Sequence, residues 1–149
     1  MELITEHRSA KAAFKEIIMR EELIQALEHA AVAGELACAD AHAIAAQFGV
    51  SPLEVGRVVN RATSLRFHRC QLGLFGYGPK AEGKSKIVLP ATNLPEEIVA
   101  AIQAQTSDGR ISCRAAWEIA EHFKYPRLGI ANILEALGIK VKPCQLGCF

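Results

Sequence analysis

The residues best suited to chemistry in this chain of 149 residues are its five cysteines. The phrase "CQLGLF" begins at Cys70 and "CQLGCF" begins at Cys144, so two cysteines occupy the same place in nearly identical hexapeptides. Cys144 and Cys148 form a C-x-x-x-C pattern. Thiolates at such positions could bind a metal ion or form a redox-active dithiol.

The spacing of Cys144 and Cys148 limits this chemistry. In an extended strand their Cα atoms would lie about 13 Å apart, too far for a shared metal ion or a disulfide. A turn at Leu146-Gly147 would bring the sulfurs together, and glycine permits one. Two thiolates are still only half of a structural zinc site. We therefore expect buried, reduced thiols that pack in the core, and a metal or redox sensor remains the alternative, with the candidate residues Cys70, Cys144 and Cys148 (and His68 as a further ligand).

The sequence contains no recognisable catalytic set. Its five histidines are scattered, and no motif links them to a nucleophile. Gly73, Gly76 and Gly78 resemble a phosphate-binding loop only superficially, because they do not follow a strand and open a helix. We expect neither an enzymatic activity nor a cofactor.

Composition narrows the class of protein. Half of the residues are apolar and 22% are charged, as in a globular protein. The net charge of +1 provides no global basic field. No apolar run is long enough to span a membrane, and the charged N-terminus lacks the apolar centre of a secretory signal. The odd number of cysteines without such a signal indicates reduced thiols, so we expect a cytoplasmic protein.

The sequence is internally duplicated. At a shift of 75 residues, "EELIQALEHAAVAGELACADAHAIAAQF" aligns with "EEIVAAIQAQTSDGRISCRAAWEIAEHF", with identities that include Gly34/Gly109 and Cys38/Cys113. After the loss of one residue near Thr63, the hexapeptides align at a shift of 74. We predict an N-terminal helical extension (1–19), a first unit (20–75), a wing and linker (76–94) and a degenerate second unit (95–149).

Units of this size bury little surface alone, so we expect them to pack together or to pair with a second chain. A homodimer is the expected assembly. In the extension, apolar residues suggest a helix that serves as a clamp or dimer contact: Ala12, Phe14, Ile17 and Ile18.

Each unit reads as three helices followed by a strand. Apolar spacing of three and four residues predicts the helices, and Gly34 and Gly109 are expected to end the first helix of each unit. The runs "LRFHRCQL" and "IKVKPCQL" predict strands. In the first unit, 86–89 could return antiparallel to the strand and form a wing, whereas the second unit has no equivalent returning segment.

This order resembles the winged helix-turn-helix superfamily. The phrase "AHAIAAQFGVSPLEVGRVVNRA" resembles its helix-turn-helix, with Ala45 at the helix crossing and Ser51-Pro52 opening the recognition helix. The segment "CQLGLFGYG" also resembles a signature of small bacterial proteins of this architecture. The resemblance implies a mainly α fold with small β wings, built as two tandem winged-helix units.

The resemblance implies that the first unit binds double-stranded DNA as a transcriptional regulator. Arg57, Asn60 and Arg61 lie opposite the apolar stripe of the third helix and would face the major groove. From Arg61 to Lys86 the chain has six lysines and arginines against one glutamate, a local basic region. The residues expected on phosphates are Arg66, Arg69, Lys80, Lys84 and Lys86.

Other readings of the same residues remain open. Ser51 and Glu54 form a capping box, so Glu54 has a structural role. The second unit has Gly129, Asn132 and Ala136 at the positions of Glu54, Arg57 and Arg61, which favours packing over DNA reading. The alternative function is a protein-interaction module, which burial of the third helix of the first unit would favour.

Overall fold

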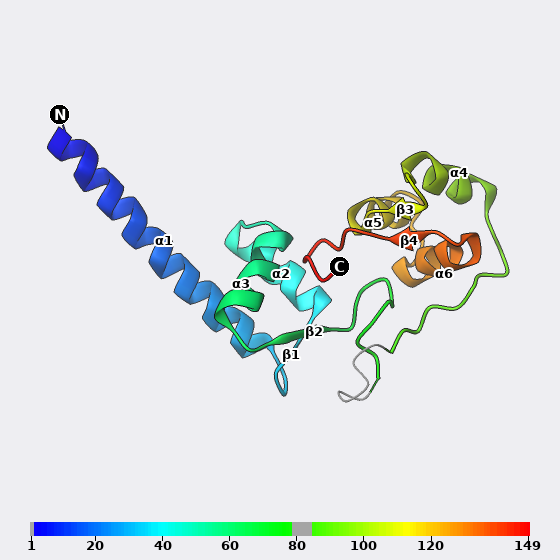
Figure 1. Ribbon diagram of the computed structural model, residues 1–149, viewed down its shortest axis with the longest axis horizontal. Coiled ribbons are helices and arrows are strands. Elements are labelled where there is room, and N and C mark those ends of the chain that lie inside the picture. Colours follow the sequence, from blue (N-terminus) through cyan, green and yellow to red (C-terminus); the bar gives the residue numbers. More distant parts are fainter. Residues whose placement is uncertain (1, 79–84) are drawn as a thin grey trace.

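The computed structural model describes residues 2–78 and 85–149, with the backbone alone for residues 2–8. These residues form a mainly helical protein with a few short strands, arranged in two lobes (Figure 1). None of the helices in the described ranges combines the length and the apolar character needed to cross a membrane.

Both lobes have the same element order, α-β-α-α-β. The N-terminal lobe consists of α1 (Glu2–Ala30), β1 (Glu35–Ala37), α2 (Cys38–Phe48), α3 (Pro52–Ala62) and β2 (Arg66–His68). The C-terminal lobe consists of α4 (Glu96–Gln105), β3 (Arg110–Ile111), α5 (Cys113–His122), α6 (Arg127–Leu137) and β4 (Lys140–Val141).

The predicted N-terminal extension is not a separate helix. It is continuous with the first helix of the lobe, so α1 runs unbroken from Glu2 to Ala30. Leu23 and Leu27, near its C-terminal end, are buried, whereas residues 9–22 are exposed. The N-terminal half of α1 therefore projects away from the lobe (Figure 1).

Gly34 and Gly109 do not end helices, contrary to the prediction. The helices end earlier, at Ala30 and Gln105. Ala33 and Gly34 both have positive φ, 52° and 79°, between Val32 and Glu35, which exchange two backbone hydrogen bonds. A two-residue turn of this kind requires two left-handed residues in succession, so the glycine belongs to the turn that starts the strand. The turn at 107–110 is built in the same way.

A tight turn joins α2 to α3. Gly49 ends α2 in the left-handed conformation, and its N–H donates to the carbonyl of Ala46. The Ser51 hydroxyl accepts a hydrogen bond from the Glu54 N–H at 3.1 Å, which caps α3, and Pro52 is the first helical residue. Local chemistry therefore fixes the turn between α2 and α3 and the residue at which α3 begins.

The predicted antiparallel wing does not form in the described residues. β2 pairs in parallel with β1, in a register that places Leu36 opposite Phe67, and β4 pairs in parallel with β3. Residues 86–89 form no strand and instead lie along α6, where Val88 is only 4% exposed. Burial of this side chain against the C-terminal lobe is favoured over exposure in a wing. Residues 79–84, the expected wing tip, lie outside the described residues.

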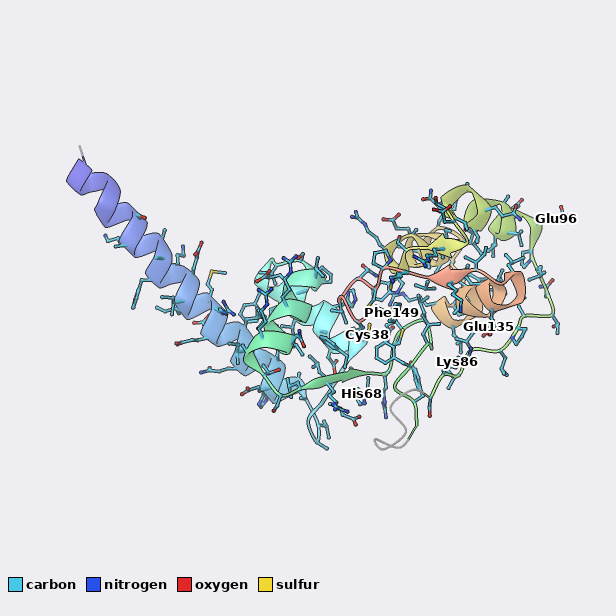
Figure 2. The ribbon with its side chains drawn as sticks, viewed as in Figure 1. Cys38, His68, Lys86, Glu96, Glu135 and Phe149 are labelled. Atoms are coloured by element: carbon cyan, nitrogen blue, oxygen red, sulfur yellow. The ribbon has the colours of Figure 1, made fainter. Side chains whose placement is uncertain are left out.

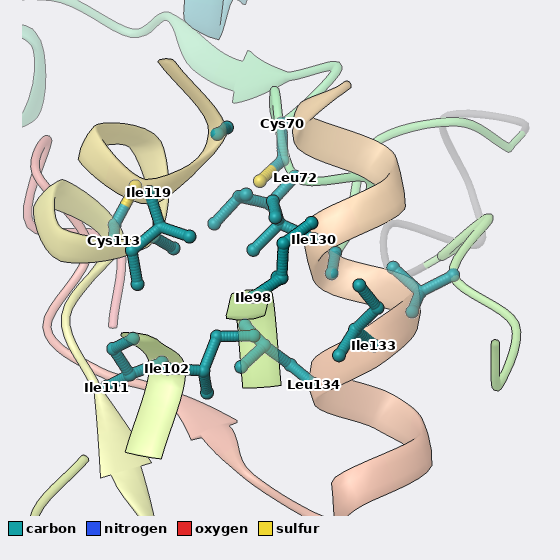
Figure 3. Close-up of a cluster of buried hydrophobic side chains, with 14 residues drawn as sticks. Cys70, Leu72, Ile98, Ile102, Ile111, Cys113, Ile119, Ile130, Ile133 and Leu134 are labelled. Atoms are coloured by element: carbon teal, nitrogen blue, oxygen red, sulfur yellow. The ribbon is translucent and has the colours of Figure 1, made fainter. Parts of the chain in front are cut away.

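Each lobe has its own hydrophobic core. Each core includes a leucine from the hexapeptide that follows the other lobe. Leu72, in the hexapeptide that follows the N-terminal lobe, is fully buried among Ile98, Ile130 and their neighbours in the C-terminal lobe (Figure 3). Leu146, in the hexapeptide that follows the C-terminal lobe, is 3% exposed in the core of the N-terminal lobe. Both leucines are packing anchors, and each anchors its hexapeptide in the other lobe.

The exchanged segment contacts α3 closely at Gly56. A Cβ at this position would lie 1.7 Å from the backbone oxygen of Leu146. The matching residue of α6 is Ala131, which is buried. Glycine is therefore required in α3 because the backbone of the exchanged hexapeptide occupies the space of a side chain.

We expect Gly56→Ala to lower the free energy of unfolding by at least about 1–3 kcal/mol, because the new methyl group displaces Leu146. Helix propensity alone predicts the opposite sign, a gain of about 0.5–1 kcal/mol. Urea unfolding followed by circular dichroism measures the change. Ala131→Gly is the control and should lower the free energy of unfolding by about 1 kcal/mol. A Gly56→Ala chain that is as stable as the original would contradict the close contact between α3 and the second hexapeptide.

Candidate functional site

The lobes meet through residues that occupy the same position in the sequence repeat. His42 of α2 stacks on Trp117 of α5, its counterpart at a shift of 75, with ring centroids 4.3 Å apart. Phe75 and Phe149, the last residues of the two hexapeptides, meet edge to face at 6.1 Å. Contacts between equivalent positions are the hallmark of an isologous interface. Trp117 packs against the cores of both lobes.

The surroundings of His42 at this contact keep its ring neutral. Burial, and secondly the positive charge of Arg127, lower the pKa of His42 to about 4. The Arg127 guanidinium lies 3.7 Å from the centroid of the Trp117 ring, on which it forms a cation–π contact. The centre of the interface is therefore an uncharged aromatic contact beside one cation.

The two hexapeptides have the same backbone conformation. The N–H of Cys70 donates to the carbonyl of Phe75, and the N–H of Cys144 donates to the carbonyl of Phe149. Within each loop, a glycine with positive φ donates its N–H to the carbonyl of the cysteine three residues earlier. Gly73 and Gly147 therefore form the bends of the two hexapeptides.

Four of the cysteines are buried near the contact between the lobes: Cys38, Cys70, Cys113 and Cys144. The backbone N–H of Gln71 donates to the thiol of Cys38, and the side-chain amide of Gln145 donates to the thiol of Cys113 at 3.3 Å. Burial nevertheless raises the pKa of Cys38 to about 12, and it raises the pKa of Cys70 and Cys113 as well. The three thiols are therefore protonated and unreactive at neutral pH.

The described residues contain no group of three or more metal-ligating side chains arranged to hold an ion. His68, considered as a ligand, lies in β2 and has its Nδ1 2.7 Å from the Glu35 carboxylate in β1. It is therefore held by the sheet, with its Nδ1 directed to Glu35.

Cys144 and Cys148 differ from the other thiols because the turn at Gly147 brings them together. The Cys148 thiol donates a hydrogen bond to the sulfur of Cys144, which lowers the pKa of Cys144 to about 6 in spite of its burial. The same interaction raises the pKa of Cys148, whose side chain is exposed. The first hexapeptide has Leu74 at the position of Cys148, so the pair occurs once.

We expect the thiolate of Cys144 to persist at neutral pH because the Cys148 thiol donates to it. In the Cys148→Ala chain the donor is lost, and burial should move the pKa of Cys144 from about 6 toward or above the ordinary value of 9.0. Ultraviolet absorbance of the thiolate across a pH titration measures this shift. Cys38→Ala is the matched control and should leave the titration unchanged; an unchanged titration in Cys148→Ala contradicts the pairing.

A groove of about 810 Å³ lies along α3 between β2 and the two hexapeptides. Its apolar wall includes Leu53, Phe67, Phe75 and Phe149. Four of the eight residues predicted to contact DNA line this groove, and all four are exposed: Arg57, Asn60, Arg61 and Arg66. No acidic residue is among the described residues that line it.

The other predicted DNA contacts are not gathered at the groove. Arg69 is exposed and follows β2, but it does not line the groove. Lys86 lies on the C-terminal lobe, where its Nζ is 3.2 Å from the Glu135 carboxylate (Figure 2). Lys80 and Lys84 lie outside the described residues. Lys86 therefore lies apart from the groove, because the segment that carries it packs on the C-terminal lobe.

The third helices of the two lobes differ in what covers them. Along α6, Asn132 accepts a hydrogen bond from the Leu89 N–H through its side chain and another from the Ala91 N–H through its backbone carbonyl. On α3, the apolar face is buried against α1, α2 and Leu146, but the arginine face is open to the groove. The structure thus covers the helix of the second unit and leaves the polar face of α3 accessible.

The groove residues contributed by the hexapeptides were missed as site residues. These residues are Leu74, Phe75 and residues 146–149, of which the sequence indicated only Cys148 as a candidate site residue. The repeat itself held the only signal, since it marks the two hexapeptides as equivalent, but it does not indicate which lobe each one contacts.

No family model matches the chain, and no curated protein and no solved structure shows significant similarity to it.

Proposed function

We propose that the chain binds double-stranded DNA as a transcriptional regulator of the winged helix-turn-helix type, with α3 in the major groove. The observation that carries the proposal is the shared exposed face of Arg57, Asn60 and Arg61 on α3, whose opposite face is buried. Arginine and asparagine are the side chains that most often read guanine and adenine edges. In a helix-turn-helix, the second helix presents such residues to the groove.

Nearby arginines support contacts to the phosphate backbone. Arg66 and Arg69 are exposed at and after β2, close in sequence to the end of α3. Arg57 lies 3.7 Å from Glu54, but both side chains are about half exposed, so this pair is weak and leaves Arg57 available. Lys80 and Lys84 complete the proposed phosphate contacts, and Lys86 is no longer among them.

The C-terminal lobe has a supporting role in this proposal. Residues 86–91 cover α6, and its Asn132 is occupied by two backbone hydrogen bonds. One DNA-reading helix per chain favours a homodimer, because helix-turn-helix dimers bind two half-sites related by symmetry. Such a regulator acts in the cytoplasm of a prokaryotic cell.

The projecting half of α1 supports dimerisation. Phe14 and Ile17 are 66% and 56% exposed, and Ile18 and Met19 lie beside them. An apolar face of this kind on a helix that extends beyond its lobe favours contact with a second copy.

The DNA proposal predicts that the double variant Arg57→Glu/Arg61→Glu loses affinity for duplex DNA by at least about a hundredfold, because two cations become anions in the major groove, where they lose their base contacts and are repelled by the neighbouring phosphates. Enrichment of a randomised duplex pool by the original chain supplies the probe, and fluorescence anisotropy at fixed salt concentration measures affinity. Arg110→Glu/Arg114→Glu changes the charge equally on the exposed surface of the C-terminal lobe and should leave affinity within about threefold. A folded Arg57→Glu/Arg61→Glu chain with full affinity rejects the proposal.

The dimer proposal predicts that Phe14→Glu/Ile17→Glu produces monomers, since two charges would be buried in the contact. Sedimentation velocity over a range of concentrations measures the assembly. Lys11→Glu/Lys15→Glu, on the same exposed half of α1, is the control for charge and should preserve the dimer. Monomeric behaviour of the original chain at all concentrations rejects this part of the proposal.

A further inference from the structure

The C-terminal lobe holds an extended segment of the chain in a defined way. Residues 86–91 run along α6, where the Leu89 N–H donates to Asn132 Oδ1 at 3.0 Å and the Ala91 N–H donates to the Asn132 carbonyl at 2.9 Å. The Ile87 N–H donates to the carbonyl of Gly73. Val88 is buried in the core of the lobe. A helix face, a hexapeptide and one apolar anchor together bind this segment.

The same surface exists on the N-terminal lobe. The sequence repeat matches Asn132 with Arg57, Glu135 with Asn60, and Gly73 with Gly147, and all three counterparts line the groove along α3. Local packing also agrees: a Cβ on Gly73 would meet Leu128, and a Cβ on Gly147 would meet Leu53, which corresponds to Leu128. In the described part of the chain, the groove on α3 therefore occupies the position that residues 86–91 fill on α6.

The two surfaces differ in their hydrogen-bonding chemistry. The α6 surface offers acceptors, the Asn132 Oδ1 and the Glu135 carboxylate that pairs with Lys86. At the groove, Arg57, Arg61 and Arg66 offer donors only. A ligand that fits the groove therefore presents carboxylates to these arginines, where residues 86–91 present a backbone N–H and a lysine to the acceptors of α6. The apolar wall of Leu53, Phe75 and Phe149 accommodates a side chain such as valine.

We propose that the groove along α3 binds an extended, acidic peptide segment of a partner protein, anchored by one small apolar side chain. Residues 86–91 on α6 show the mode of binding, and the arginines of the groove set the charge of the ligand. This inference goes beyond DNA binding, because the peptide contact requires no DNA. If both ligands bind, they compete, since both contact Arg57 and Arg61.

The probe is a fluorescent, capped peptide of residues 85–91 carrying Lys86→Glu and Leu89→Glu, and the protein is the full chain. We expect saturable binding by fluorescence anisotropy, and binding at least about tenfold weaker for the unmodified, basic peptide, because an acidic residue gains a charge-assisted hydrogen bond. Arg57→Gln should weaken binding of the acidic probe roughly tenfold. Arg114→Gln, on the exposed face of α5, should leave binding of the probe unchanged.

Phe149→Ala separates the peptide groove from DNA binding. It removes part of the apolar wall without changing the charge, so it should weaken the acidic probe at least about fivefold and leave DNA affinity unchanged. Circular dichroism melting verifies that each variant is folded.

Three results overturn the inference: no saturable binding of the acidic probe, equal binding of the acidic and unmodified peptides, or equal effects of Arg57→Gln and Arg114→Gln. If self-association of the chain displaces the probe, the groove binds a second copy of the chain, and this result also overturns the inference. A chain that binds the probe but no duplex rejects the DNA proposal alone, and the reverse result rejects the peptide proposal alone.

Discussion

The reciprocal burial of Leu72 and Leu146 is the interaction on which the rest of this structure depends. Each leucine is supplied by the segment that follows one lobe and is buried in the core of the other. A lobe of this size buries little apolar surface and is only marginally stable by itself, and a fully buried leucine contributes about 1.5–3 kcal/mol. The exchange therefore completes two cores at once and couples their stability.

The same exchange builds the groove beside α3. With Leu146 inserted in the N-terminal lobe, residues 147–149 lie next to α3, and Phe149 meets Phe75. Gly56 is necessary for this approach because a side chain would collide with the Leu146 backbone. The turn at Gly147 also places Cys148 beside Cys144. The apolar wall contributed by residues 147–149 and the thiol pair are thus consequences of one packing event, whereas the arginines of α3 are placed by the helix itself.

The two lobes present different surfaces on the same order of elements. Asn132 of α6 accepts a backbone hydrogen bond and holds residues 86–91, whereas its counterpart Arg57 can only donate. One face is consequently covered and the other is open and cationic. The net charge of +1 conceals this difference, because the basic residues of α3 and β2 are balanced by acidic residues elsewhere in the chain.

The sequence by itself determined the local features of this protein. The helical periodicity, the cap at Ser51 and Pro52, the left-handed Gly49 and the bends at Gly73 and Gly147 each depend on neighbouring residues. The exposed arginine face of α3 was predictable for the same reason, since it lies opposite an apolar stripe. Only the tertiary structure decided that β2 pairs in parallel with β1, that Lys86 lies on the C-terminal lobe, and that each hexapeptide enters the opposite core. Each of these features depends on a contact between residues that are distant in sequence. Because the two halves of the sequence have nearly the same spacing of apolar residues, this spacing does not indicate which lobe a segment contacts.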